Sequence, residues 1–271
     1  MWTGVLLGTI GRVSSETWPS LWLILEINLM AFITFIAGRW SAKKTRMIYF
    51  VVQSIGRLVV LRGGVVTDTR SQLSHWVLLG MLLKTSLAPL HFWGAAIIVK
   101  LSKHTAAMFL TWQKIAPIFI IILTAPKALL HIILIMNMLV SSRCGIGSKN
   151  LYVLLFFSGL LHIRWLLTSP MVVASTYFFL YRFSTLPIIL TDISIDLPIL
   201  IMNMAGLPPL TGFIIKLNAL QHIRMSYGIL LLSLSTPLLY AYIRNFLFSR
   251  IRNRGSLNAL TILVCILGLI F

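Results

Sequence analysis

Long apolar segments alternate with short polar links along the whole chain. We count eleven such segments, at residues 1–13, 19–38, 47–61, 73–93, 105–126, 128–142, 151–168, 171–190, 197–220, 228–248 and 256–271. Most approach the ~20 residues that a helix needs to cross a bilayer, and none shows the strict alternation of a half-buried strand. The pattern predicts an all-α fold, a polytopic transmembrane helix bundle of about eleven helices that forms one domain over residues 1–271.

Composition places the chain in a membrane. Hydrophobic residues make up 58% and charged residues 10% of it, whereas a soluble domain carries roughly 25% charged residues. The net charge of +18 comes from basic residues gathered in the polar links, where they set orientation and contact anionic phospholipids such as cardiolipin. No aromatic and basic face accompanies them, so we expect no nucleic-acid partner. Two cysteines far apart in the sequence predict neither a metal site nor a disulfide framework.

The basic links also test the number of segments. If the segments cross the membrane in alternation, most basic link residues, among them Arg39, Lys43, Lys44 and Arg252, fall on the side of the N-terminus. The positive-inside rule makes that side the cytoplasm or the matrix. A miscounted segment would scramble this bias, so the bias supports the count.

Three lysines lie inside apolar segments, each near prolines. Their contexts are LLKTSLAPLHFW around Lys84, TWQKIAP around Lys114 and GLPPLTGFIIK before Lys216. An ionisable group at the middle of a bilayer costs at least ~2.5 kcal/mol, so it usually marks a functional site. We expect a path for protons. The alternative for each lysine is a side chain that snorkels to the membrane surface.

The prolines predict helix breaks beside these lysines. Pro89 and Pro117 each remove a backbone donor, and the adjacent Pro208 and Pro209 cannot lie inside a regular helix. A broken helix leaves carbonyls unpaired, which is tolerated only against protein or a water-filled cavity. Discontinuous helices of this kind mark ion paths in transporters. We therefore expect hydrated breaks near the three lysines.

Glu26 is an acidic residue inside an apolar segment, LWLILEINLMAFI. An unpaired carboxylate in lipid would take up a proton, whereas a lysine partner would keep both groups charged. Lys84 is the candidate partner, and the alternative is a purely structural ion pair. Arg57 and Arg164 stay protonated at any working pH, so they cannot carry protons. They either set the field for the lysines, snorkel, or contact lipid or a neighbouring subunit.

Two histidines, His91 and His162, lie in apolar surroundings. Either could relay protons near neutral pH, and the alternative is a structural, hydrogen-bonded histidine. Lys84 and His91 share one helix face if the helix continues through Pro89. The sequence contains no Gly-rich phosphate loop, catalytic triad, haem-type histidine pair or cysteine cluster. We therefore expect no redox cofactor and no metal in this chain.

Five strings carry a resemblance to a known family. LEINLMAF, KTSLAPLHFW, LTWQKIAP, GLPPLTGF and LLYAYIRNFLFS occur in this order between about residues 16 and 250. In order and spacing they resemble the subunit 2 family of NADH dehydrogenase, the antiporter-like membrane subunits of mitochondrial respiratory complex I. The chain departs from the family at Arg57 and Arg164, where relatives carry small residues. An organelle gene with reassigned arginine codons would explain both departures.

The resemblance implies a fold and a set of roles. It implies two inverted repeats with one broken helix each, a Glu26–Lys84 pair, Lys114 as the central lysine and Lys216 as the lysine near the outlet. It further implies the inner mitochondrial membrane, neighbouring antiporter-like and other membrane-arm subunits as partners, and NADH, FMN, iron–sulfur clusters and ubiquinone in partner subunits.

We therefore expect a proton-translocating subunit of NADH:ubiquinone oxidoreductase that performs no redox chemistry itself. Protons would move along a buried glutamate and lysine axis, coupled to electron transfer elsewhere. The alternatives are a stand-alone cation/proton antiporter with the same lysines, and an inert scaffold subunit whose lysines only form structural pairs.

Overall fold

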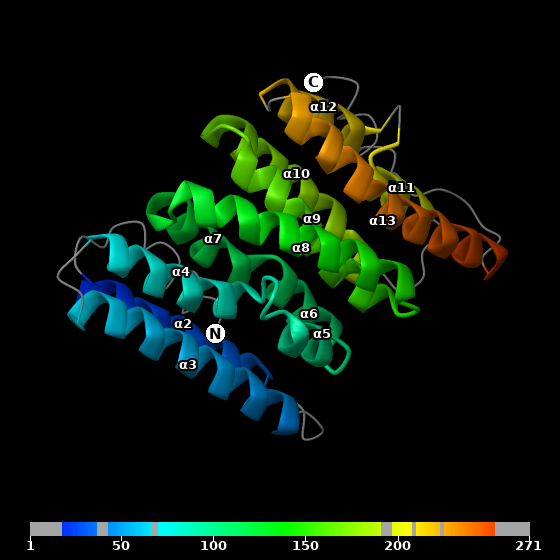
Figure 1. Ribbon diagram of the computed structural model, residues 1–271. Helices are drawn as coiled ribbons and strands as arrows, with labels where there is room; N and C mark the ends of the chain where they lie inside the picture. The colour runs from blue at the N-terminus through cyan, green and yellow to red at the C-terminus, as the bar shows by residue number, and fades with distance from the viewer. Residues whose placement is uncertain are drawn as a thin grey trace. The chain divides into compact units, whose positions relative to one another are not determined.

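The computed structural model describes residues 18–36, 43–66, 70–190, 197–207, 210–222 and 225–252, and its described elements are helices (Figure 1). In chain order they are α2 (Trp18–Ile36), α3 (Lys43–Val66), α4 (Arg70–Thr85), α5 (Phe92–Ile98), α6 (Lys103–Leu110), α7 (Trp112–Thr124), α8 (Lys127–Gly147), α9 (Leu151–Thr168), α10 (Met171–Leu190), α11 (Leu197–Ala205), α12 (Thr211–Gln221) and α13 (Met225–Arg252). The all-α prediction is confirmed. The predicted segments 1–13 and 256–271 lie outside the described residues.

Four helical stretches within the described ranges are long and apolar enough to cross a membrane. They are Lys103–Thr124, Ala128–Gly147, Leu151–Thr168 and Val172–Leu190. Shorter apolar helices occur at Leu25–Ile36 and Gly228–Arg244. Their length and composition agree with the membrane protein that the sequence predicts.

Two predicted segments are broken as the prolines indicated. The segment 73–93 divides into α4 and α5 around Pro89, and the segment 197–220 divides into α11 and α12. Pro208 and Pro209 themselves lie outside the described residues. Because α4 ends at Thr85, Lys84 lies in its last turn rather than in the middle of a continuous helix.

The break predicted at Pro117 is wrong. Helix α7 continues through Pro117, and the interruption falls earlier, at Thr111, between α6 and α7. The Thr111 hydroxyl donates to the Ala107 carbonyl at 2.6 Å, a local bond of the type that bends helices. The chain therefore turns before it reaches the proline, which costs α7 only the donor to the Gln113 carbonyl.

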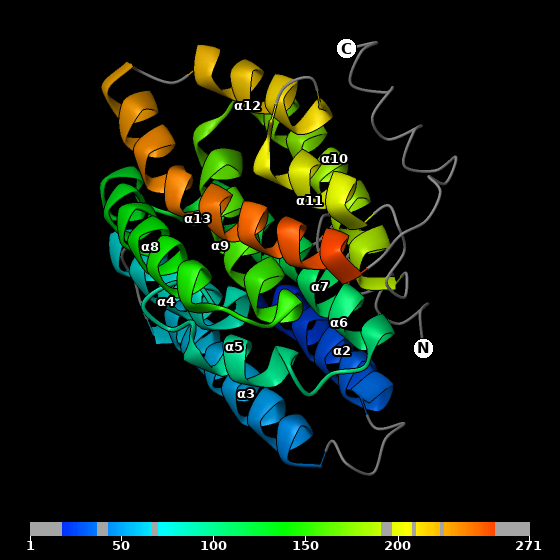
Figure 2. The same cartoon turned by 90° about the vertical axis from the view of Figure 1, so that its right-hand side faces the viewer.

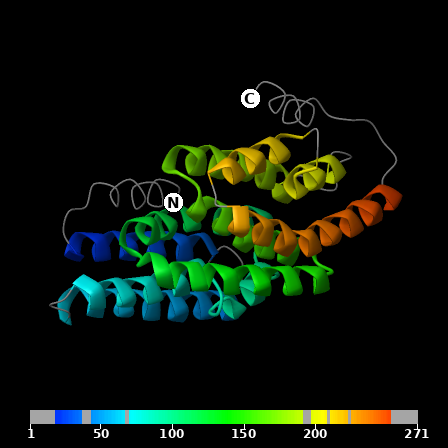
Figure 3. The ribbon, with the colours of Figure 1, turned by 45° about the horizontal axis from the view of Figure 1, so that its top comes forward.

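The chain divides into two compact units, residues 1–136 and 137–271, a division that the prediction of one domain did not include. In the first unit α3 packs against α2, α4 and α5, and α4 packs against α7 (Figure 3). Its core holds an aromatic cluster of Phe32, Tyr49, Trp93 and Phe109, in which ring centroids lie 4.9–6.4 Å apart.

In the second unit α11 packs against α10 and α13, and α10 also packs against α9 and α12 (Figure 2). Helix α9 is the buried element: its residues from Leu154 to Leu166 are all buried. Asn150 caps its N-terminus by accepting the Tyr152 N–H at 3.1 Å. Each unit thus contains a broken helix that packs against neighbouring helices.

Candidate functional site

The first half of each broken helix ends in the same backbone motif. At the end of α4, the Leu87 N–H donates to the Leu82 carbonyl at 3.1 Å and the Ser86 N–H donates to Leu83 at 3.3 Å. Ser86 has φ +55°. This pair of bonds around a left-handed residue is the Schellman motif, which closes a helix C-terminus.

Helix α11 repeats that motif. The Leu207 N–H donates to Met202 at 3.4 Å, the Gly206 N–H donates to Asn203 at 3.0 Å, and Gly206 has φ +76°. The strings SLAPLHFW (86–93) and GLPPLTGF (206–213) share leucine, proline and leucine at matching places. The first half-helices of the two breaks therefore end in the same way, with serine at the left-handed position of the first and glycine in the second.

A cavity of about 20 Å³ lies at the first break, lined by side chains of α2, α3, α4, α6 and α7. That volume admits one water molecule. Two of the lysines singled out in the sequence, Lys84 and Lys114, both line it, although they come from different helices. Their residues are 8% and 2% exposed. Side chains buried so deeply inside a helix bundle do not snorkel.

Amide side chains complete the polar wall of this cavity. Gln113 donates from Nε2 to Asn28 Oδ1 at 3.2 Å, and Gln53 donates from Nε2 to the backbone carbonyl of Lys84 at 3.3 Å. The second bond satisfies a carbonyl in the last turn of α4. A Cβ added to Gly56 would lie 3.2 Å from Lys84 Cγ, so the lysine stem runs along the backbone of α3.

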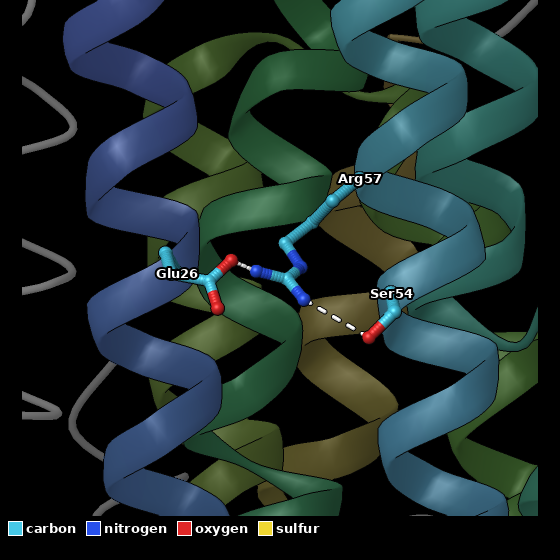
Figure 4. Close-up of polar contacts among 3 residues, drawn as sticks. All are labelled: Glu26, Ser54 and Arg57. Carbon is cyan, nitrogen blue, oxygen red and sulfur yellow. Dashed lines mark hydrogen bonds and ion pairs between the residues drawn. The ribbon is translucent and has the colours of Figure 1, made fainter.

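Glu26 on α2 forms an ion pair with Arg57 on α3, as Figure 4 shows. Arg57 also donates from Nη2 to Ser54 Oγ at 2.9 Å. The sequence nominated Lys84 as the partner of Glu26 and left the role of Arg57 open. The pairing was missed because it depends on which residue of α3 faces α2.

A second cavity, also of about 20 Å³, lies at the second break. Its polar lining includes His162, Tyr177, Tyr181, Ser184, Asn203 and Lys216. Lys216 reaches back across the break and donates from Nζ to the Ala205 carbonyl at 2.6 Å. The ammonium therefore sits at the carboxyl end of α11, where the helix dipole favours a positive charge.

Asn203 forms hydrogen bonds to the helices on both sides of the second break. Its Oδ1 accepts the Gly212 N–H at 2.8 Å and the Thr211 hydroxyl at 2.7 Å, and its Nδ2 donates to Ser184 Oγ at 3.0 Å. One amide thus joins the end of α11, the start of α12 and the middle of α10. The sequence singled out the prolines here but gave no signal for Asn203.

His162 is held by two tyrosines one turn apart on α10. Its Nδ1 is hydrogen-bonded to the Tyr177 hydroxyl, and its ring centroid lies 4.2 Å from that of Tyr181. The Tyr181 hydroxyl bonds Ser158 Oγ at 3.1 Å. Within the described part of the chain, no hydrogen-bond partner reaches His162 Nε2. The spacing of the tyrosines was a sequence signal that could have found this network.

The remaining candidates lie apart from the two lysine cavities or deep in α9. His91 is the N-cap residue of α5, beyond the break, with its ring 4.1 Å from that of Phe92. The condition under which it would share a helix face with Lys84, a helix that continues through Pro89, is not met, because α4 ends at Thr85. Arg164 on α9 is 0% exposed, which excludes both snorkelling and contact with lipid or a neighbouring subunit.

The fold is that of antiporter-like membrane subunits. A chain of respiratory complex I from Thermus thermophilus has a TM-score of 0.79 to this chain at 17% identity, covering 98% of this chain and 76% of that one. A chain of the Mrp complex from Dietzia sp. DQ12-45-1b has a TM-score of 0.77 at 16% identity, covering 89% and 58%.

The chain is homologous to NADH-ubiquinone oxidoreductase chain 2. The protein of that name from Anopheles gambiae is 27% identical over 279 residues, which cover 89% of this chain and 82% of the relative. Homologues of the same name occur in many further animals. No family model matches the chain.

Proposed function

We propose that the chain is a proton-translocating membrane subunit of NADH:ubiquinone oxidoreductase in the inner mitochondrial membrane. The observation that carries the proposal is the pair of buried lysines, Lys84 and Lys114, on one water-sized cavity beside a helix break. The homology to NADH-ubiquinone oxidoreductase chain 2 supports the membership of the chain in this complex. Electron transfer, with its NADH, FMN, iron–sulfur clusters and ubiquinone, belongs to partner subunits, and neighbouring membrane-arm subunits are the direct partners.

The mechanism is electrostatic. At ~7 Å and an effective dielectric of ~20, two unit charges interact by roughly 2 kcal/mol, which exceeds one pKa unit. A change in the charge around Glu26 and Lys84 therefore alters how readily Lys114 holds its proton, and Lys114 in turn acts on Lys216. Water in the two cavities carries the proton between side chains, with His162 and, at the far side of the first break, His91 as further relays.

The test replaces Lys114 by methionine in the assembled complex reconstituted in lipid vesicles. We expect a lower proton-to-electron ratio, because the central site can no longer hold a charge. Lys100→Met is the matched control, since Lys100 is exposed, and it leaves the ratio unchanged. An unchanged ratio and unchanged NADH oxidation in Lys114→Met would refute the proposal.

A stand-alone cation/proton antiporter is the second candidate, and the likeness of the fold to a chain of the Mrp complex favours it. Such a protein needs no redox partner. Cation/proton exchange by the purified chain alone in vesicles would support it, whereas activity only within the complex supports the first proposal. Full pumping with Lys84, Lys114 and Lys216 all neutralised would leave a scaffold role.

A further inference from the structure

Arg57 places a permanent positive charge beside the predicted switch of the first unit. The residue is 7% exposed, and its guanidinium lies between the Glu26 carboxylate and Ser54 Oγ (Figure 4). An arginine keeps its proton at any working pH and offers a fork of donors to a carboxylate. Glu26 is therefore compensated by a charge that does not titrate.

Lys84 lies against the same stretch of α3. The Gln53 side chain bonds its backbone carbonyl, and the Lys84 stem runs past Gly56, the neighbour of Arg57. The ion pair and the titratable lysine thus share one helix segment. If Lys84 alone compensated Glu26, each loss of its proton would leave a carboxylate that is only 27% exposed without a counter-charge, which is unfavourable.

We propose that Arg57 is a positioning residue that keeps Glu26 ionised whether or not Lys84 carries a proton. Lys84 then releases and regains its proton while Glu26 keeps a counter-charge. In this chain the switch is a triad of Arg57, Glu26 and Lys84 instead of a glutamate–lysine pair. The inference rests on the proposed role of Lys84 in proton translocation.

The first test is a cycle of variants in the assembled complex, read out as the amount of complex recovered. With Arg57 present, Lys84→Met assembles at the wild-type level because Glu26 keeps its partner. In the Arg57→Met background, Lys84→Met leaves Glu26 without a counter-charge. The amount of complex recovered then falls on the order of tenfold further. Adding Glu26→Gln restores it. Equal losses from Lys84→Met in the two backgrounds would overturn the inference.

The second test distinguishes a positioning role of Arg57 from a purely structural role. Complexes of Arg57→Met that assemble oxidise NADH but pump with a lower proton-to-electron ratio, because Glu26 now holds the proton of Lys84 in place. Arg57→Lys restores part of the ratio. Normal pumping by Arg57→Met, or a peptide mass that shows serine at position 57, overturns the inference.

Lys114→Met distinguishes a failure of the role proposed for Arg57 from a failure of the proposed function. If Lys114→Met lowers the ratio while Arg57→Met does not, only the role of Arg57 fails. If neither variant lowers it, the proposed function fails as well.

Discussion

The two helix breaks differ in where their ammonium group comes from. At the first break the lysine belongs to the first half-helix: Lys84 lies in the last turn of α4. At the second break the matching position is Met204, and the charge comes from Lys216 on the second half-helix, which reaches back to the Ala205 carbonyl. Both arrangements put a positive charge at a helix carboxyl end, where the dipole stabilises it.

The two breaks therefore share the position of a charge rather than the residue that carries it. The two cavities also differ in their remaining walls. Amide groups of Asn28, Gln53 and Gln113 face the first, whereas the second has the imidazole of His162 and the tyrosines of α10. The backbone motif is common to both, and the side chains around it give each cavity its own chemistry.

Replacement of Lys216 has the largest expected effect on the second break. Lys216→Met removes both the titratable group and the donor to Ala205, so we expect loss of pumping and a lower thermal stability of the complex. Lys216→Arg retains a charge and a donor but cannot release a proton. It should therefore keep most of the stability and still lose pumping, measured as the proton-to-electron ratio. Equal pumping by both variants and the wild type would make Lys216 a structural cap.

Gly212→Ala is the largest steric change that the comparison offers. A Cβ at position 212 would lie 1.9 Å from the Asn203 backbone oxygen, so the two half-helices must move apart, at about 1–3 kcal/mol or more. The matched position of the first break is Phe92, whose side chain is 73% exposed. We expect Phe92→Ala to change stability by less than about 0.5 kcal/mol. The heat-induced dissociation of the complex measures both, and similar losses would contradict the close approach of the two half-helices at Gly212.

The left-handed positions should respond in opposite directions. Gly206→Ala forces a Cβ into a left-handed conformation, at ~1–2 kcal/mol, and places it 2.7 Å from Lys216 Nζ. Ser86→Gly removes a Cβ from the same conformation and should stabilise by about 0.5 kcal/mol after the greater chain entropy of glycine is subtracted. Thermal dissociation of the two variants checks the signs. A destabilised Ser86→Gly would show that the Ser86 hydroxyl, which donates to the Thr85 carbonyl at 2.5 Å, matters more than its backbone.

Sequence patterns predicted the helices and two of the three breaks because apolar runs and prolines act locally. The third break depends on a threonine hydroxyl that bonds one turn back, and threonine at such a place has several alternative partners. Lys84 and Lys114 were found because charge is rare in lipid. Their common cavity, the Arg57–Glu26 pair and the bridging Asn203 depend on which helix faces pack together, and a single sequence does not contain that information.

Two further side chains connect a neighbouring helix to each break. Gln53 on α3 donates to the Lys84 carbonyl, and Ser184 on α10 accepts from Asn203. Gln53→Met removes one buried hydrogen bond, and Ser184→Ala removes the bond from Asn203 together with a local bond to the Leu180 carbonyl, so each should destabilise the complex by about 1 kcal/mol.

The two variants should differ in function. The Gln53 bond ends on the backbone of Lys84 itself, so its loss loosens the lysine and should lower the proton-to-electron ratio. The Ser184 bond ends on Asn203, which still holds Gly212 and Thr211 through its other atom. Ser184→Ala should therefore pump normally at a temperature where both complexes are intact. If instead Ser184→Ala lowers the ratio and Gln53→Met does not, the second break rather than the first controls the proton path.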